Sequence, residues 1–456
     1  MKLYNTLSRK IEQVAPLSDK SLSLYTCGLT VYSRPHIGNW VAYIYWDVLE
    51  RTLRAEGYEV NRVQNITDVG HLVSDEDEGE DKLQKGADRE GVTAWEIAKK
   101  YARIADKEAF EELGLRRPEH MPKATDYIKQ QIDFVRELEN KGFTYQIEDG
   151  IYFDTSKLDD YGKLAKLDIE GLQSGARVAD AGKKNVTDFA LWKFSPRDQK
   201  RDMEWDSPWG KGFPGWHLEC SVMARELLGD QINIHTGGVD HIPVHHTNEI
   251  AQTEALTGKQ FSQFWLHANH IKVDGAKMSK SLGNIYTLDD IKNKGFSPQA
   301  FKLLVLSKHY RTEGNFTWDI LEAAQNRLNN WRAMFNRRWQ LAVLSNDQPD
   351  ISSEILAALH NDIDTPAALA RIDTYFDDVD KSRAMPNRDT LLTIRDVLGM
   401  DLLEYDITDE QKQLIQQRQE AKAKKEFEAA DTIRGQLEEQ GILLKDTQHG
   451  TIWSRK

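Results

Sequence analysis

Two short stretches of the sequence carry side chains suited to phosphate chemistry, and they lie far apart in the chain. The first is HIGN at residues 36–39. His36 and Asn39 can donate hydrogen bonds to a phosphate if a helix begins here, because the free N–H groups and the dipole of a helix N-terminus favour anions. Taken by itself this tetrapeptide is a weak signal, since an ordinary turn with a capping histidine has the same composition.

The second stretch is VDGAKMSKSLGN at residues 273–284, a glycine-flanked loop without apolar periodicity. Its lysines, Lys277 and Lys280, can reach phosphate groups that leave in a transition state, where a preorganised cation is strongly stabilising. A solvated basic loop is the alternative. The specific order KMSKS, together with HIGN upstream, favours the phosphate role.

A third set of side chains includes both cysteines of the chain, Cys27 and Cys220. His245 and Glu249 are four residues apart in an expected helix, so they share one face of it. Thiolate, imidazole and carboxylate groups are all zinc ligands, and these four residues are a candidate tetrahedral set. Their spacing forms no compact metal motif. The alternative is a buried, apolar Cys220 and a surface contact between the histidine and the glutamate.

The elements around the first cysteine form a recognisable unit. Residues 21–27 alternate as a strand does, residues 40–56 have helical periodicity, and YEVNRVQNI at residues 58–66 predicts a second strand. In such a βαβ unit, ligands gather at the carboxyl ends of the strands, where helix N-termini point. Cys27 and His36 both fall at that edge.

The remaining elements divide the chain into segments. An acidic run at residues 74–81 predicts a solvated loop, residues 93–142 a helical stretch, and residues 143–190 short strands and loops. The α/β pattern then resumes with a helix after Gly215, the strand QINIH, a helix near His245 and the stretch FWLHANHIKV. A separate helical module begins after Thr317, one long charged helix is expected over residues 409–440, and a short hairpin around Gly450 ends the pattern.

Bulk composition limits the function classes. A chain of 456 residues with 39 % apolar residues should form about two to four domains. It has no apolar run near the length of about 18 residues that a membrane helix requires, and two cysteines do not make a disulfide framework. We expect a soluble, unexported protein in the reducing cytoplasm. The net charge of −13 counts against nonspecific polyanion binding, although a local basic face can still hold nucleic acid.

Together these stretches resemble the class I aminoacyl-tRNA synthetases, and specifically the cysteinyl-tRNA synthetase family, from about residue 20 to the C-terminus. The resemblance rests on YTCGLTVYSRPHIGNW at 25–40, NITD at 65–68, PGWHLEC at 214–220, GGVDHIPVHHTNEIAQ at 237–252, KMSKSLGN at 277–284 and EFEAADTIRGQLEEQGILLKDTQHGTIW at 426–453.

The resemblance implies an α/β fold with a Rossmann-type parallel-sheet catalytic domain and an inserted connective subdomain, followed by a helical bundle and a small C-terminal anticodon-binding domain. The implied segments are the catalytic halves 1–110 and 190–260, the insertion 111–189, a KMSKS-containing stem-contact region 261–316, the bundle 317–404 and the C-terminal domain 405–456.

The implied reaction is ATP-dependent activation of L-cysteine, with magnesium, and transfer of the cysteinyl group to tRNA(Cys) by a monomer. One zinc ion would select the substrate thiol, held by Cys27, Cys220, His245 and Glu249, with His246 as the runner-up histidine. The phosphates would meet His36, Asn39, Lys277 and Lys280, and the adenosine would meet Gly237, Gly238 and Asp240. The amino-acid pocket would be shaped by Gly28, Thr67 and Trp216, although Trp216 also fits the role of a core aromatic.

The chain departs from the family pattern at several points. Asn39 replaces the usual final histidine of HIGH, and it can donate a hydrogen bond but carries no charge. The following residues, WVA, lack the family's frequent arginine. VGHL follows NITD in place of an Asp-rich turn, and PVHHTNE replaces FPHHENE, which is why His246 is a second candidate ligand.

Two other functions fit parts of the sequence. A cysteine ligase that acts on an amino sugar would have a similar catalytic core but would need no anticodon domain, so the C-terminal helix and hairpin favour tRNA. A zinc-stabilised RNA-binding relative without activation chemistry is the second alternative. KMSKS and His36 argue against it, and Asn39 argues for it.

Overall fold

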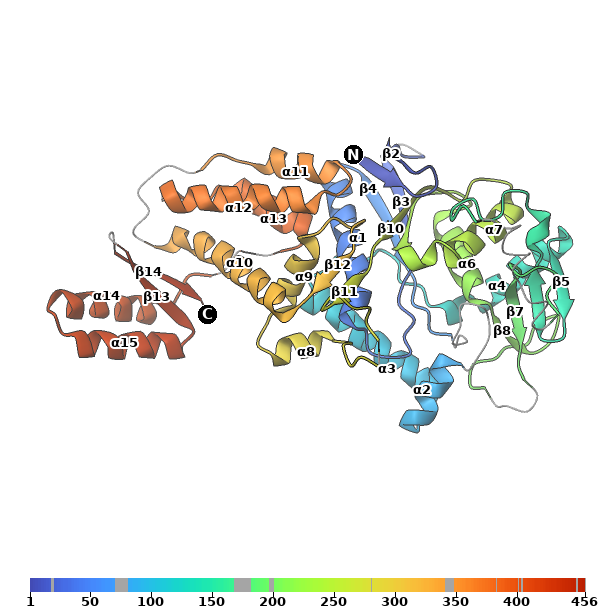
Figure 1. The fold of residues 1–456 in the computed structure, drawn as a ribbon, viewed down its shortest axis with the longest axis horizontal. Coiled ribbons are helices and arrows are strands. Elements are labelled where there is room, and N and C mark those ends of the chain that lie inside the picture. The colour runs from blue at the N-terminus through green and yellow to red at the C-terminus, as the bar shows by residue number, and fades with distance from the viewer. Residues whose placement is uncertain are drawn as a thin grey trace. The chain divides into compact units, whose positions relative to one another are not determined.

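The computed structural model describes residues 1–17, 20–69, 81–167, 182–196, 201–279, 281–340, 348–382, 384–400, 402, 405–447 and 450–455 (Figure 1). The chain forms two compact units. The first comprises residues 1–272, 277–288 and 310–314, and the second comprises residues 273–276, 289–309 and 315–456. Residues 74–80 of the expected acidic loop lie outside the described ranges, as does Lys280.

A four-stranded parallel sheet is the centre of the first unit. Its strands are β3 Ser21–Thr26, β4 Glu59–Gln64, β9 Ile232–Gly238 and β10 Ser262–Ala268, in the order β10-β9-β3-β4. All three pairings are parallel. Leu22, Leu24 and Tyr25 of β3 are fully buried, as expected for an inner strand covered on both faces. The parallel-sheet fold predicted from the sequence is therefore confirmed.

The strand order reverses between β3 and β9. From β3 the chain crosses through helix α1, Ile37–Ala55, to β4 on one side, and from β9 it crosses through α7, His245–Thr257, to β10 on the other. In open α/β sheets, ligands bind in the crevice beyond the carboxyl ends of the strands at such a switch point. The fold therefore places the main candidate site beyond Thr26 of β3 and Gly238 of β9.

A second, antiparallel sheet interrupts the two halves of the parallel one. Its order is β5-β6-β7-β8, and its core packs Phe153, Phe189 and Trp192 against helix α4. The short strands expected in this part of the sequence are thus present. The elements of this region are α2 Lys82–Glu90, α3 Ala94–Asp106, a π-helical segment Lys107–Glu112, α4 Ile128–Asn140, β5 Thr144–Ile147, β6 Gly150–Phe153, β7 Phe189–Phe194 and β8 Gly212–Pro214.

Helix α6, Trp216–Leu228, follows β8 and leads into β9. The smaller elements are the hairpin β1 Lys2–Asn5 with β2 Lys10–Gln13, the strand pair β11 Ile271–Val273 with β12 Gly314–Phe316, and the short helix α8 Leu288–Asn293.

The second unit is mainly helical. Helix α10 begins at a cap in which the Thr317 hydroxyl accepts from the Ile320 amide. The unit's elements are α9 Pro298–Leu306, α10 Trp318–Asn336, α11 Ser352–His360, α12 Thr365–Ser382, α13 Arg388–Leu398, α14 Asp409–Ala423, α15 Phe427–Glu439, and the antiparallel hairpin β13 Ile442–Thr447 with β14 Gly450–Arg455.

The single helix expected over residues 409–440 is wrong, because the chain breaks between α14 and α15. Lys425 adopts a left-handed conformation with φ 65°, and the Glu426 amide donates to the Ala421 carbonyl at 2.9 Å, which closes α14. The break allows Ile415 of α14 and Leu437 of α15 to share one apolar cluster with the hairpin. The expected hairpin around Gly450 is confirmed.

Candidate active site and metal centre

A cavity of about 670 Å³ opens at the switch point of the parallel sheet, within the first unit. Segments far apart in the sequence form its wall: the end of β3, the start of α1, the end of β9, the first turns of α6 and α7, and the loop that begins at Lys277. Its lining includes twelve of the residues predicted from the sequence: Cys27, Gly28, His36, Asn39, Thr67, Trp216, Cys220, Gly237, Gly238, Asp240, His245 and Lys277.

The four predicted metal ligands converge beside this cavity, and three of them line it. Cys27 follows β3, and its amide donates to the Thr236 carbonyl at 3.2 Å, which fixes it against β9. Cys220 comes from α6, and the pair His245 and Glu249 comes from α7. One potential ligand atom from each lies within 4.8 Å of the others, and all four residues are buried.

The geometry of this set fits a tetrahedral zinc ion. The two sulfur atoms, Cys27 Sγ and Cys220 Sγ, are 3.9 Å apart. Two Zn–S bonds of about 2.3 Å at the tetrahedral angle give a separation of about 3.8 Å. Glu249 Oε1 lies 3.0 Å from His245 Nε2 and 3.7 Å from Cys27 Sγ. The donor chemistry, two thiols with one imidazole and one carboxylate, also suits zinc.

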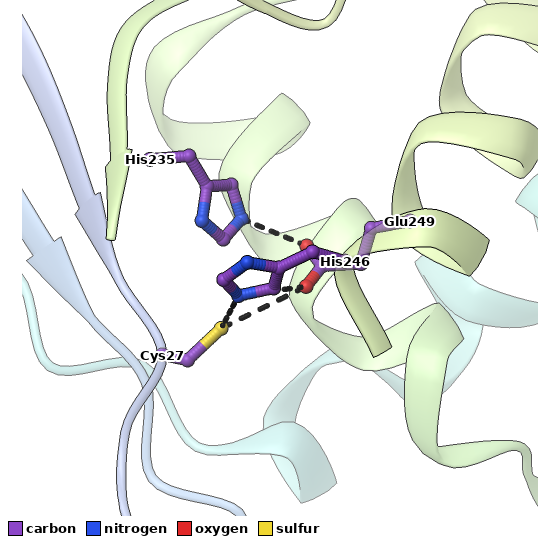
Figure 2. Close-up of side chains that lie close together, drawn as sticks. All are labelled: Cys27, His235, His246 and Glu249. Atoms are coloured by element: carbon purple, nitrogen blue, oxygen red, sulfur yellow. Dashed lines mark hydrogen bonds and ion pairs between the residues drawn. The ribbon is translucent and has the colours of Figure 1, made fainter. Parts of the chain in front are cut away.

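His246 lies beside the same two ligands. Its Nε2 is 3.3 Å from Cys27 Sγ and 3.9 Å from Glu249 Oε1. Figure 2 shows this second arrangement, in which Cys27, His235, His246 and Glu249 also offer four ligand atoms within 4.8 Å of one another. The two candidate sets share Cys27 and Glu249, and only the set with His245 contains both cysteines.

An outer ring of histidines supports these ligands. His235 Nε2 lies 2.9 Å from Glu249 Oε2, and His217 Nδ1 lies 3.0 Å from His245 Nδ1. His246 Nδ1 contacts His267 Nε2 at 2.8 Å. Such second contacts fix the orientation and tautomer of ligating side chains. The sequence reasoning missed His217, His235 and His267. Each lies within an element that the sequence predicted near the site, and the sequence contains no other indication of their role.

Burial and the charges of neighbouring groups set the protonation of the cluster. Burial lowers the pKa of His245, but the neighbouring Glu249 carboxylate and the Cys220 sulfur outweigh it and raise the pKa to about 10. Burial raises the pKa of Glu249, but His235 and His245 hold it below its usual range. Burial also raises the pKa of the Cys27 thiol, whereas the hydrogen bond from Cys27 lowers that of Cys220. Binding of a metal cation by these groups would release the protons of His245 and of the thiols.

The HIGN turn lies at the N-terminus of α1, as predicted. The Asn39 side-chain oxygen accepts from the His36 amide at 2.9 Å, so Asn39 caps the helix. Burial lowers the pKa of His36, which is therefore a neutral hydrogen-bonding group near pH 7.

The loop that begins at Lys277 packs directly against this turn. The Ile37 amide donates to the Tyr286 carbonyl at 2.8 Å, and a side chain at Gly38 would collide with Met278. The Asn284 side chain holds the loop by accepting from the Ser279 amide at 2.8 Å and donating to the Lys277 carbonyl at 3.2 Å. The two predicted phosphate stretches therefore meet, with the exposed Lys277 on the cavity wall.

The predicted amino-acid pocket lies between this turn and the metal ligands. The Gly28 amide donates to Asn65 Oδ1 at 2.7 Å, and any Cβ at residue 28 would collide with the Asn65 carbonyl, so only glycine fits. Asn65 also donates to the Thr67 hydroxyl at 2.9 Å. Trp216 is half-buried on the cavity wall, and its ring centroid lies 4.5 Å from that of His245. It lies in the cavity wall and not in the core.

The predicted adenosine contacts lie at the end of β9. Gly237 leaves room for the rings of His241 and His246, which would lie only 2.6 Å from a Cβ at that position. Asp240 Oδ1 lies 2.8 Å from His270 Nε2, and both residues line the cavity. Glu249 lies in the metal cluster behind the cavity wall, and Lys280 falls outside the described residues.

The comparisons with known proteins agree with this fold. Residues 13–326 match the family model described as tRNA synthetases class I (C) catalytic domain. The methionyl-tRNA synthetase of Mycobacterium tuberculosis in complex with methionyl-adenylate superposes with a TM-score of 0.54 at 15 % identity, covering 88 % of this chain and 84 % of that one. An arginyl-tRNA synthetase from Campylobacter jejuni, described as putative, gives 0.51 at 14 % identity, over 84 % and 91 %. The catalytic part is that of a class I aminoacyl-tRNA synthetase.

Sequence relatives define the family within this class. Residues 404–453 match the cysteinyl-tRNA ligase anticodon binding domain. The cysteine–tRNA ligase 1 of Burkholderia lata is 43 % identical, covering 98 % of this chain and 95 % of that protein, and the cysteine–tRNA ligase of Treponema denticola is 38 % identical over 100 % and 99 %. The chain belongs to the cysteinyl-tRNA synthetase family, as the sequence motifs predicted.

Among helices in the described ranges, none has the length and apolar character needed to cross a membrane.

Proposed function

We propose that this protein is a cysteine–tRNA ligase that activates L-cysteine with ATP and transfers the cysteinyl group to the 3′ end of tRNA(Cys). The observation that carries the proposal is the convergence of Cys27, Cys220, His245 and Glu249 beside a cavity that is also lined by the HIGN turn and Lys277. In this proposal, a thiol-selective metal site and a phosphate site share one cavity.

The zinc ligands in this proposal are the set that contains both cysteines. When bound, zinc would take the substrate sulfur as a further ligand, and it bonds a thiolate far better than a neutral hydroxyl. This chemistry selects cysteine over serine, which a pocket that only excludes larger side chains separates poorly. Trp216 beside His245 and the Gly28 backbone would then hold the rest of the small amino acid.

In the activation step, the substrate carboxylate oxygen attacks the α-phosphorus of ATP, and the bond to the bridging oxygen of pyrophosphate breaks. His36 donates a hydrogen bond as a neutral imidazole, and Lys277 supplies positive charge to the departing phosphates. Lys280 is proposed for the same role on its sequence position. Magnesium accompanies ATP, and Gly237, Gly238 and Asp240 are proposed to hold the adenosine.

In the transfer step, a terminal ribose hydroxyl of tRNA attacks the carbonyl of cysteinyl-adenylate and AMP leaves. The match of residues 404–453 to an anticodon binding domain supports tRNA as the acceptor. It argues against the amino-sugar ligase, which needs no such domain. A monomer acting in the cytoplasm is part of the proposal.

The test is a pair of assays on the purified protein together with its metal content. We expect cysteine-dependent ATP–pyrophosphate exchange, little exchange with serine, one zinc per chain, and transfer of cysteine to tRNA(Cys). Transfer to an amino sugar instead of tRNA would favour the alternative ligase. Absence of exchange with any amino acid would overturn the catalytic assignment.

A further inference from the structure

The HIGN turn of this chain lacks a permanent positive charge. Asn39 and Trp40 are neutral residues, and burial keeps His36 uncharged near neutral pH. Asn39 is also engaged in capping α1 through its carbonyl oxygen. ATP and pyrophosphate carry several negative charges, so a site for them gains from a fixed cation close to the turn.

Arg34 lies two residues before this turn and lines the same cavity. In the described part of the cavity wall, the arginine and lysine side chains are Arg34 and Lys277. The Arg34 side chain is 34 % exposed, and its Nε donates to Glu108 Oε1 at 2.8 Å. A guanidinium group is always charged, and the planar arrangement of its donors matches the geometry of phosphate oxygens.

Glu108 accepts hydrogen bonds from one residue on each side of the HIGN turn. Its Oε1 accepts from Arg34, and its Oε2 accepts from Trp40 Nε1 at 3.1 Å. The Glu108 side chain is 1 % exposed, so its charge depends on this arginine for compensation. It comes from the π-helical segment Lys107–Glu112 that continues α3, and such segments occur frequently at functional sites. A segment distant in sequence is thus used to orient the residues around the HIGN turn.

We infer that Arg34 is an additional phosphate-binding residue of adenylate formation, that Glu108 is its positioning residue, and that Arg34 supplies the charge which Asn39 and Trp40 do not. The inference rests on the proposed function, because it assigns a role within the same reaction. It concerns Arg34, which precedes the HIGN turn within the stretch at residues 25–40, and Glu108, which lies outside the stretches on which the family resemblance rests.

The first test compares Arg34→Gln with Arg51→Gln. Arg51 forms the same kind of contact, from its Nε to the buried Asp47 Oδ2 at 2.8 Å, but it does not line the cavity. We expect Arg34→Gln to slow ATP–pyrophosphate exchange by about 10- to 100-fold with unchanged cysteine affinity. Arg51→Gln should leave exchange near the wild-type rate. Equal rates in wild type and Arg34→Gln, with Lys277→Ala slowed, would overturn the inference.

The second test separates positioning from folding. Glu108→Gln should lower kcat for exchange in the wild-type background but have little further effect when combined with Arg34→Gln, because both changes act through one side chain. Full additivity of the two effects would assign Glu108 a purely structural role and overturn its part of the inference. Asn39→His, combined with Arg34→Gln, should recover part of the lost rate at pH 6, where an added imidazole gains charge.

The same experiments distinguish this inference from the proposed function. If the wild-type protein shows no cysteine-dependent exchange, the proposed function fails and the role of Arg34 fails with it. If the wild-type protein exchanges and Arg34→Gln does so equally well, only the role of Arg34 fails.

Discussion

Cys220 is the ligand whose sulfur distinguishes the two overlapping metal sets, since the set with His246 does not contain it. We predict that Cys220→Ser loses zinc and cysteine-dependent exchange, because a neutral hydroxyl is a poor zinc ligand at neutral pH. Zinc content and exchange would be measured on the same preparation, with thermal unfolding to confirm that the variant is folded. Full zinc occupancy with unchanged cysteine affinity would refute the ligand assignment.

The two neighbouring histidines can be separated by a matched pair of substitutions. We predict that His245→Gln loses zinc, because His245 lies 3.0 Å from Glu249 Oε1 in the set that contains both thiols. His246→Gln should keep zinc, because the proposed ligand set does not include His246, which lies beside Cys27. The zinc content of both variants distinguishes the two assignments. Zinc retained in His245→Gln and lost in His246→Gln would identify His246 as the ligand.

Residue spacing offers no geometric reason to group the four proposed ligands, because only His245 and Glu249 are close in the chain. Their shared helix face was predictable, and the structure confirms it. Their grouping with Cys27 and Cys220 came from family resemblance. His235 and His217 were missed because their contacts form only after β9 and α6 pack against α7, and local periodicity does not report that packing.

At the scale of elements, helix α1 is fixed to the sheet by one buried carboxylate. Glu50 accepts from Arg54 and Arg116 at 2.8 Å and from Arg62 of β4 at 3.1 Å, and the Glu50 and Arg62 side chains are almost fully buried. Because this network fixes the helix whose N-terminus forms the HIGN turn, its loss should disturb the candidate site and also destabilise the fold.

We predict that Glu50→Ala lowers the free energy of unfolding by about 3–5 kcal/mol, because it leaves the buried Arg62 charge unpaired. Asp106→Ala is the control, since Asp106 pairs with Arg117 on the surface, and it should cost less than about 1 kcal/mol. Urea unfolding followed by tryptophan fluorescence measures both. Similar losses in the two variants would mean that the buried Glu50 ion pairs contribute no more to the free energy of unfolding than a surface ion pair does.

Most elements of the first unit were predictable because their apolar periodicity is clear. The strand over residues 21–27 and the helix over residues 40–56 correspond to β3 and α1. The break at Lys425 was not predictable, since the sequence there has neither glycine nor proline. A left-handed lysine costs about 1–2 kcal/mol, and packing of two helices against the hairpin offsets it. Such tertiary compensation leaves no local signal.

At the scale of the whole molecule, the C-terminal hairpin is held in a defined place within the second unit. Gln340, after α10, donates to the Trp453 carbonyl at 2.9 Å and accepts from the Trp453 amide at 3.0 Å. Both contacts are buried. The side-chain amide therefore pairs with β14 as a neighbouring strand would, and it fixes the hairpin to the end of α10.

We predict that Gln340→Ala leaves cysteine-dependent exchange unchanged but lowers kcat/KM for tRNA by about tenfold, since two buried hydrogen bonds contribute about 1–3 kcal/mol. Gln416→Ala is the matched control, because Gln416 donates to the exposed Glu420 carboxylate at 3.1 Å, and it should retain wild-type kcat/KM. Steady-state aminoacylation with varied tRNA measures the effect. A wild-type value in Gln340→Ala would show that this contact does not position the hairpin.

The long separation between the first and last metal ligands also has a consequence for biosynthesis. Cys27 precedes Glu249 by 222 residues. At about 5–20 residues per second, a ribosome makes Glu249 roughly 10 to 40 s after Cys27. For most of that interval the nascent Cys27 thiol has no partner from α6 or α7, and the proposed metal ion can be captured only when the second half of the sheet has been synthesised and has folded onto the first.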